Sequence, residues 1–309
     1  AVNDGPDLGS AHAYAAAAKS PATIKAYRGA WLAFAAWCGE SSLSALPCEP
    51  VTLAAYIAHR ADEGSSAASL DLYLAAISEA HRCAGHVSPR ESVEVRTVRA
   101  GIRRTNGVAQ RRAAPATADI VRAMVATVTD GLAGARDRAV LLVGFAGAFR
   151  RSELVALTVA DVAFSARGLE VTIRRSKTDQ EGAGRTVAIP FGSSADACPV
   201  RALRAWLEVA GIAAGPVFRS VDRAGRVSAG ALSDRSVANI VKEAVELAGC
   251  DAAMFSGHSL RAGLATSAAL AGRSDRSIMA QTGHRSRAMV DRYVRAADMW
   301  RENAAGGLL

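Results

Sequence analysis

The chain has 309 residues, of which 50% are hydrophobic and 21% are charged, so it is long enough for two domains that each bury a core. Its formal net charge of +8 includes 37 basic residues, and only four of these are lysines. Arginine carries a planar fork of N–H donors that matches phosphate oxygens, so this composition favours a polyanionic partner. A genome that encodes basic residues mostly as arginine would produce the same bias.

The sequence predicts neither a membrane span nor secretion. The longest apolar run, 139–149, is much shorter than the roughly 20 residues that cross a bilayer, and it is typical of a buried helix. The first ten residues, AVNDGPDLGS, lack the basic start and apolar stretch of a signal peptide. The five cysteines are scattered and form no CxxC pair, which indicates reduced thiols and a cytoplasmic protein.

The first part of the chain predicts an all-helical domain. Residues 1–19 resemble a flexible tail, and after them apolar residues recur every three or four positions. Ser20-Pro21 is a typical helix start, since serine accepts a hydrogen bond from a free backbone N–H and proline fits the first helical position. Four or five helices are expected within 20–107. After the first helix, the helical patterns lie at about 50–62, 67–84 and 89–105.

A small, basic segment at 108–118 follows and is predicted to be an exposed linker between domains. Positive charge gathers in this region, with seven arginines against two glutamates between Arg90 and Arg112. A solvated helix face explains some of this charge, and a basic hinge along a phosphate backbone explains it better. On the second interpretation, the candidate contacts are Arg103, Arg104, Arg111 and Arg112.

Residues 119–309 predict a second domain that combines helices with a small β-sheet. Two β-prone segments, 169–174 and 185–190, flank the turn residues SKTDQEGAG, which indicates a hairpin. The fold class expected for the whole chain is therefore mainly α with a small β-sheet. The helical patterns of this domain lie at about 119–128, 135–149, 199–210, 233–248, 259–270, 274–282 and 286–295.

Two candidate cations stand near the predicted hairpin. Arg150 follows the apolar helix and precedes Glu153 by three positions, so the carboxylate is placed to hold the guanidinium. A solvated helix end with a surface ion pair is the plain alternative. Lys177 lies in the hairpin turn and, unlike arginine, can give up its proton during catalysis. A soluble turn residue is the alternative there.

Further candidates lie near the end of the chain. His258 and Arg261 are three positions apart, so they share a face if a helix begins there, and together they suit an anionic substrate with a transferable proton. A capping histidine beside a surface arginine is the alternative. His284 precedes Tyr293 by nine residues. This tyrosine either packs in the core or acts as a nucleophile activated by nearby cations or a base. Without a recognisable metal or nucleotide motif, the set favours phosphoryl transfer stabilised by side-chain cations.

The order and spacing of these motifs resemble the active site of tyrosine recombinases, the phage integrase family. The shared pattern is R-x-S-E-L after an apolar helix, a lysine in a β-turn, G-H-S-L-R, and G-H with a tyrosine nine residues on. The stretches SGHSLRAGLATSAALAG and IMAQTGHRSRAMVDRYV are especially similar to Cre-type site-specific recombinases. The resemblance implies a core-binding domain at 20–107 and a catalytic domain at 119–309, which form a C-shaped clamp on duplex DNA.

The resemblance also implies how the bond to phosphorus is exchanged. Tyr293 would attack a scissile phosphate, form a 3′-phosphotyrosyl link and release a 5′-hydroxyl. Lys177 would give a proton to the leaving oxygen, and His258 would act as acid or base near the nucleophile. No metal and no cofactor is implied, because the phosphotyrosine conserves the bond energy for rejoining.

The remaining site residues are implied to bind the phosphate. Arg150, Arg261 and His284 would hold the non-bridging oxygens, and Glu153 would orient Arg150. Arg151 stands where the family more often has isoleucine or valine, so it either faces DNA or marks a slightly shifted helix start.

The implied partners are a duplex with an inverted-repeat recombination site and three further copies of the chain, in a homotetramer on two DNA sites. Met299 and Trp300 lie in the segment implied to dock on a neighbouring protomer, and internal packing is the alternative for them. A catalytically idle DNA-binding or architectural protein and a type IB topoisomerase-like enzyme are the other functions considered. The intact set of six residues argues against the first, and the match over both domains argues against the second.

Overall fold

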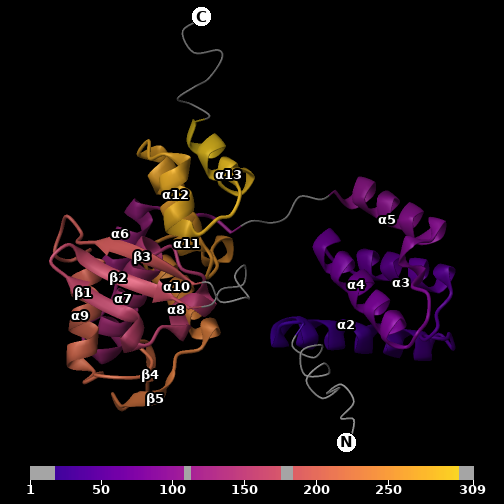
Figure 1. Ribbon diagram of the computed structural model, residues 1–309, viewed down its shortest axis with the longest axis horizontal. Coiled ribbons are helices and arrows are strands. Elements are labelled where there is room, and N and C mark those ends of the chain that lie inside the picture. Colours follow the sequence, from indigo (N-terminus) through magenta and orange to yellow (C-terminus); the bar gives the residue numbers. More distant parts are fainter. Residues whose placement is uncertain (1–17, 108–112, 175–183, 299–309) are drawn as a thin grey trace, which may run out of the picture. The chain divides into compact units, whose positions relative to one another are not determined.

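The computed structural model describes residues 18–107, 113–174 and 184–298. The chain divides into two compact units, Ala1–Arg111 and Arg112–Leu309, whose elements are coloured in chain order in Figure 1. The described residues form a mainly helical fold with two small antiparallel sheets, which confirms the expected fold class. Among them, no helix combines the length and the apolar character that crossing a bilayer requires.

Four α-helices and a short 3₁₀ turn make up the described part of the first unit, and the helices lie where the sequence predicts them. Three of the helices begin at a serine, Ser20, Ser66 or Ser92, whose hydroxyl accepts a hydrogen bond from the backbone N–H three residues later. Within the unit, α2 packs on α4 and α3 packs on α5. The elements are α2 (Pro21–Glu40), α3 (Pro50–Asp62), α4 (Ala67–Cys83), η1 (Pro89–Glu91) and α5 (Val93–Asn106).

The core of this unit joins an aromatic cluster to one buried histidine. The Tyr56 ring meets the rings of Phe34 and Tyr73 edge-on, with centroids 4.9 and 5.6 Å away. His81 is fully buried, and its Nε2 accepts a hydrogen bond from the Cys48 N–H at 3.0 Å. Its Nδ1 therefore carries the proton and donates to a carbonyl oxygen one turn earlier in α4. The histidine thus fixes the loop between α2 and α3 to α4.

The second unit is built around helix α7, whose apolar second half is buried among α6, α9, α10 and α11. Its three-stranded sheet has the order β1-β2-β3 and is antiparallel, with Val171 of β2 opposite Val187 of β3. Figure 1 shows α11, α12 and α13 packed together at the yellow end of the chain. The helices are α6 (Ala118–Ala126), α7 (Leu132–Ala146), α8 (Arg151–Ala156), α9 (Pro199–Val209), α10 (Asp234–Leu247), α11 (Ser259–Leu270), α12 (Asp275–Thr282) and α13 (Arg287–Asp298), with 3₁₀ turns η2 (Val159–Asp161) and η3 (Ala252–Met254). The strands are β1 (Val162–Ser165), β2 (Gly168–Ile173), β3 (Arg185–Pro190), β4 (Arg219–Val221) and β5 (Val227–Ala231).

The helices and the two strands expected in this unit are confirmed, and the structure adds short elements that the sequence does not predict. Helix α8 has six residues, fewer than two turns, so no apolar period develops along it. Strand β1 has four residues and pairs with β2, and β4 and β5 form a separate two-stranded sheet. Pairing partners, rather than local pattern, create these strands.

The chain enters the second unit along α11. Residues 113–118, named the strap here, lie against this helix, and Ala116 within the strap is fully buried. Gly263 of α11 permits the close approach, because a Cβ at this position would lie 1.7 Å from the carbonyl oxygen of Ala116. Three backbone N–H groups of the strap donate hydrogen bonds, from Ala114 to Met254 O (2.6 Å), from Ala116 to Ser259 O (2.9 Å) and from Ala118 to Ser267 Oγ (2.9 Å).

The predicted exposed linker at 108–118 is therefore wrong over its second half. The residues of the strap are small, and the absence of large apolar side chains is why the sequence predicts that they are exposed. Small side chains are also what a segment needs to lie close to a helix, which is how the strap uses them. Residues 108–112, including Arg111 and Arg112, lie outside the described residues.

Candidate active site

A buried carboxylate holds Arg150 at the start of α8. Arg150 is the N-cap of this helix, and Glu153 is only 3% exposed. Glu153 Oε1 accepts a hydrogen bond from Arg150 Nη1 at 2.5 Å, and Oε2 accepts one from the Arg150 backbone N–H at 2.9 Å. The Glu153 carboxylate thus caps the backbone N–H at the helix start and also fixes the Arg150 guanidinium, as the R-x-S-E-L spacing predicts.

Arg261 reaches the same place from α11. Its side chain is buried, and Nη1 donates to the carbonyl oxygen of Ala148 at 2.7 Å. Ala148 lies in the turn between α7 and α8 and has a φ of 49°, a left-handed conformation that costs energy in any residue but glycine. Burial and the neighbouring Arg150 lower the pKa of Arg261 to about 10, against the opposing effects of Glu153 and Tyr293. Arg261 is therefore within electrostatic range of Arg150, Glu153 and Tyr293.

His284 follows the left-handed turn that ends α12. Its Nδ1 lies 2.8 Å from the hydroxyl oxygen of Thr282, and that hydroxyl lies 2.6 Å from the carbonyl oxygen of Ile278. Because the carbonyl only accepts, the threonine donates its proton there and accepts from Nδ1–H of the histidine. With the proton of the neutral ring on Nδ1, Nε2 bears a proton only when His284 is charged.

Tyr293 of α13 packs beside this histidine. The two rings stack with centroids 6.1 Å apart and an angle of 25° between their planes. The tyrosine is half-buried against an apolar cluster from three helices, which includes Ala265, Ile278 and Val290. The tyrosine therefore packs partly into the core, and its action as a nucleophile stays a prediction.

A third guanidinium, which the sequence does not single out, belongs to Arg185 at the first position of β3. Its Nη1 donates to the carbonyl oxygen of Gln281 at 3.0 Å, and its Nη2 lies 3.6 Å from Glu153 Oε2. Burial lowers the pKa of Arg185, with Glu153 opposing and Arg150 assisting that shift. The period of two in a strand places Arg185 on the face of the buried Val187, and this is the signal that could have found it.

The resulting cluster carries an excess of positive charge. Arg150 and Arg185 contact the carboxylate of Glu153 and Arg261 lies within its electrostatic range, while Nη2 of both Arg185 and Arg261 is buried without a hydrogen-bond partner. Buried donors and uncompensated cations are stabilised by an anion that enters the site. Within 18–107, 113–174 and 184–298, no group of three or more His, Cys, Asp or Glu is arranged to hold a metal ion.

His258 and Arg151 are close in sequence to the cluster residues Arg261 and Arg150. His258 is the exposed N-cap residue of α11, one position before the helix, whereas Arg261 in the first turn is buried. The stem of Arg151 crosses the loop just before His258, since a Cβ at Gly257 would lie 1.9 Å from Arg151 Cδ. Lys177, the remaining predicted catalytic residue, lies outside the described residues.

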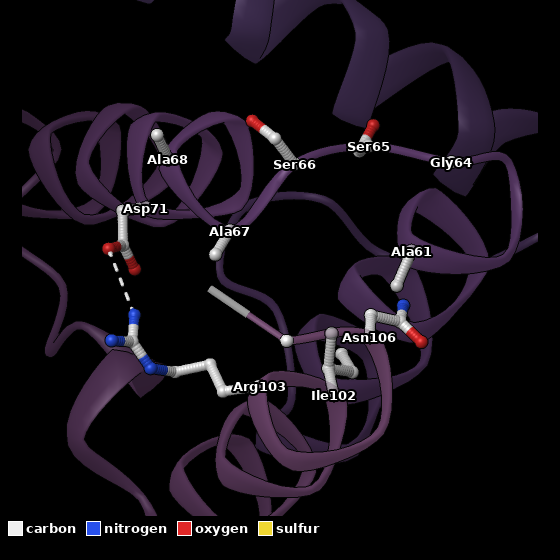
Figure 2. Close-up of a pocket in the computed structure, with 11 residues that line it drawn as sticks. Ala61, Gly64, Ser65, Ser66, Ala67, Ala68, Asp71, Ile102, Arg103 and Asn106 are labelled. Carbon is white, nitrogen blue, oxygen red and sulfur yellow. Dashed lines mark ion pairs between the residues drawn. The ribbon is translucent and has the colours of Figure 1, made fainter. Parts of the chain in front are cut away.

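The first unit has its own basic region at the end of α5. Arg103 pairs with Asp71 of α4 at 3.9 Å, and Arg104 beside it is exposed. Figure 2 shows Arg103 and Asp71 on one side of a pocket of about 390 Å³, opposite the turn at 64–66. Arg103 and Arg104, two of the arginines predicted to contact a phosphate backbone, thus lie at the surface of the unit.

Family models match both parts of the chain. The model of the phage integrase family matches residues 116–299, and the model of the phage integrase N-terminal SAM-like domain matches residues 13–86. The chain is 41% identical over 291 residues to an integrase/recombinase xerD homolog of Selenomonas ruminantium, covering 93% of this chain and 85% of that protein. It is 27% identical over 285 residues to the recombinase cre of Escherichia phage P1, covering 86% and 81%.

Solved structures share the fold. A lambda integrase (75–356) dimer bound to a COC′ core site superposes with a TM-score of 0.61 at 18% identity, covering 90% of this chain and 89% of that one. The XerH site-specific recombinase bound to palindromic difH substrate gives a TM-score of 0.59 at 16% identity, covering 82% and 73%.

Proposed function

Because the chain belongs to the phage integrase family of site-specific tyrosine recombinases, we propose that it cuts and rejoins duplex DNA through a 3′-phosphotyrosyl intermediate on Tyr293. One observation carries the proposal. Two arginines from different elements, Arg150 and Arg261, lie within electrostatic range of one carboxylate, that of Glu153, and Tyr293 is within electrostatic range of Arg261. A phosphodiester entering this cluster would find cations that stabilise its transition state within electrostatic range of the attacking tyrosine.

The cleavage step exchanges one ester for another. Tyr293 Oη attacks phosphorus, a new P–O bond forms to the tyrosine, and the bond to the 5′-oxygen breaks. Arg150 and Arg261 hold the charge that develops on the non-bridging oxygens, and charged His284 donates Nε2–H to one of them. His258 takes the phenolic proton, and Lys177 supplies the proton that the 5′-oxygen gains. Reversal with a different 5′-hydroxyl rejoins the strand without an external energy source.

Both units are proposed to contact the duplex. Arg103 and Arg104 of α5 would bind backbone phosphates, and so would Arg111, Arg112 and Arg151. Neutralising any one of them should weaken binding to all duplexes alike and reduce the salt dependence of binding, with no change in the preferred site. We also propose that the protein acts in the cytoplasm, on the nucleoid, where its DNA substrate would lie.

The proposed assembly is a homotetramer on two inverted-repeat sites. Support comes from the family and from two solved structures. The lambda integrase is a dimer bound to a core site, and XerH is bound to a palindromic substrate. Met299 and Trp300 are proposed to anchor the contact between protomers. Sedimentation of the DNA complex should show four protein chains for two duplexes, and Trp300→Ala should reduce that number without weakening binding to a single site.

Covalent trapping tests the proposal. DNA fragments from around the protein's own gene are incubated with the chain and denatured, and the tryptic peptides are searched for a nucleotide linked to Tyr293. The expected result is an adduct on this peptide that Tyr293→Phe abolishes while the same fragments stay bound. Binding without any adduct would instead favour the alternative function, a DNA-binding protein without strand transfer. An adduct that persists in Tyr293→Phe would refute the assignment of the nucleophile.

A further inference from the structure

Arg185 has no part in the reaction proposed above, although it contacts two regions that hold reacting groups. We propose that Arg185 is a positioning residue that sets Arg150 and His284 relative to one another, through the Glu153 carboxylate on one side and the end of α12 on the other. The inference rests on the roles proposed for Arg150 and His284.

The first connection runs through Glu153. Its Oε2 accepts from the Arg150 backbone N–H at 2.9 Å and lies 3.6 Å from Arg185 Nη2, while Oε1 holds the Arg150 guanidinium. The carboxylate is almost fully buried, so it has little freedom to turn away from either arginine. Moving Arg185 therefore changes the electrostatic environment of the group that orients Arg150.

The second connection runs through the turn before His284. Arg185 Nη1 donates to the carbonyl oxygen of Gln281, one of the last carbonyls of α12, which lack partners within the helix. Gly283 has a φ of 68°, and a Cβ there would lie 2.9 Å from Arg185 Nε, so the guanidinium packs directly on this turn. The Gln281 side chain also donates to Ala188 O of β3 at 3.1 Å. The turn that presents His284 is thus built on β3.

The energetics favour a specific role over an incidental one. Burial and the charge of Arg150 both disfavour a cation at this position, and they lower the pKa of Arg185. An arginine that only solubilised the start of β3 would point to water and avoid this cost. The guanidinium instead offers two donors at a fixed angle, one toward Gln281 and one toward Glu153. An ammonium group has no such fork, so lysine serves as a charge-conserving test.

Single-turnover cleavage tests the proposal on a fragment that wild type binds and cleaves. Arg185→Lys should slow formation of the covalent complex by roughly 10- to 100-fold, the cost of small misplacements in a catalytic site, and should change the dissociation constant less than about 3-fold. The matched control is Arg219→Lys at the start of β4, where the arginine likewise donates to a backbone carbonyl, Pro216 O at 2.9 Å. The control should cleave at the wild-type rate.

A double-variant comparison separates positioning from other roles. If Arg185 acts by placing His284, Arg185→Lys should slow cleavage at least 3-fold less in a His284→Ala background than in wild type, because the group that Arg185 positions is gone. An undiminished effect there would overturn the proposal and favour direct binding of phosphate by Arg185. Equal losses of binding and cleavage in the single variant would also overturn it.

Histidine NMR supplies a readout that needs neither DNA nor activity. With ¹³C-labelled histidines, the His284 resonance is assigned by its absence in His284→Ala. It should move in Arg185→Lys and stay in place in Arg219→Lys, and an unmoved resonance in Arg185→Lys would contradict the inference. Failure of wild type to form the Tyr293 adduct would instead refute the proposed function, while this measurement would still decide the role of Arg185.

Discussion

Gly263→Ala measures how tightly the strap lies on α11. Alanine gains about 1 kcal/mol of helix propensity over glycine. Its Cβ, however, would lie 1.7 Å from Ala116 O and 2.4 Å from the carbonyl carbon, whereas real Cβ atoms essentially never come within 3.0 Å of another atom. The strap must therefore move, because its backbone cannot rotate out of the way as a flexible side chain would.

The size of the effect follows from what the movement disturbs. Two hydrogen bonds flank the contact, those donated by Ala116 and Ala118, and each contributes about 1 kcal/mol. Overpacking of the interface adds about 1–3 kcal/mol. After the gain in helix propensity is subtracted, a net destabilisation of about 2–4 kcal/mol remains, which lowers the melting temperature of the second unit by roughly 5–15 °C.

Differential scanning calorimetry of the full chain provides the assay, and Gly29→Ala provides the control. Gly29 lies within α2, and a Cβ there would have no atom within 4 Å. The same substitution should therefore stabilise the first unit by up to about 1 kcal/mol. Melting of Gly263→Ala at or above the wild-type temperature would refute the reasoning, since it would mean that the strap does not approach α11 this closely.

Two further predictions concern carboxylates. Glu153→Ala leaves Arg150 and Arg185 as partly buried cations without their counter-charge, and should destabilise the second unit by about 3–5 kcal/mol in urea unfolding. A loss below about 1 kcal/mol would show that water already reaches the cluster. Hydrogen bonds from Arg82 and Lys19 lower the pKa of Glu79 to about 2 from its ordinary 4.5. Because the folded-state pKa is the lower one, this stabilisation is complete above pH 4.5 and disappears as the pH falls through about 2. Glu79→Gln should then cost at most about 1 kcal/mol at pH 7 and nothing near pH 1, and a cost that did not vary with pH would contradict the ion-pair explanation.

Local pattern was sufficient for most of the fold. The apolar period and the serine caps place α2 to α5, and the alternation in 185–190 gives β3 its observed bounds. The pattern fails where stability comes from a partner segment. Strand β1 exists because β2 pairs with it, and the strap is ordered by hydrogen bonds to α11. Neither contact leaves a period or a cap in the sequence.

In the candidate site too, contacts between residues close in sequence are predictable and contacts between distant residues are not. Arg150 and Glu153 are three residues apart, so their contact is local and readable from the spacing. Arg185 meets Glu153 across 32 positions of sequence, and only its place on the buried face of β3 hints at the contact. Sequence spacing likewise predicts that His258 and Arg261 lie close together. It does not predict that His258 is exposed and Arg261 is buried.

The strap also determines where a mechanical load would enter the second unit. Its hydrogen bonds to α11 and the preceding loop are spaced along the chain, so a pull on residue 113 would act on them one after another. The first to bear tension joins Ala114 to Met254, four residues before His258. A force applied to residue 113 would therefore strain the loop that leads to His258 first. Only afterwards would the tension act on the buried first turn of α11, which holds Arg261.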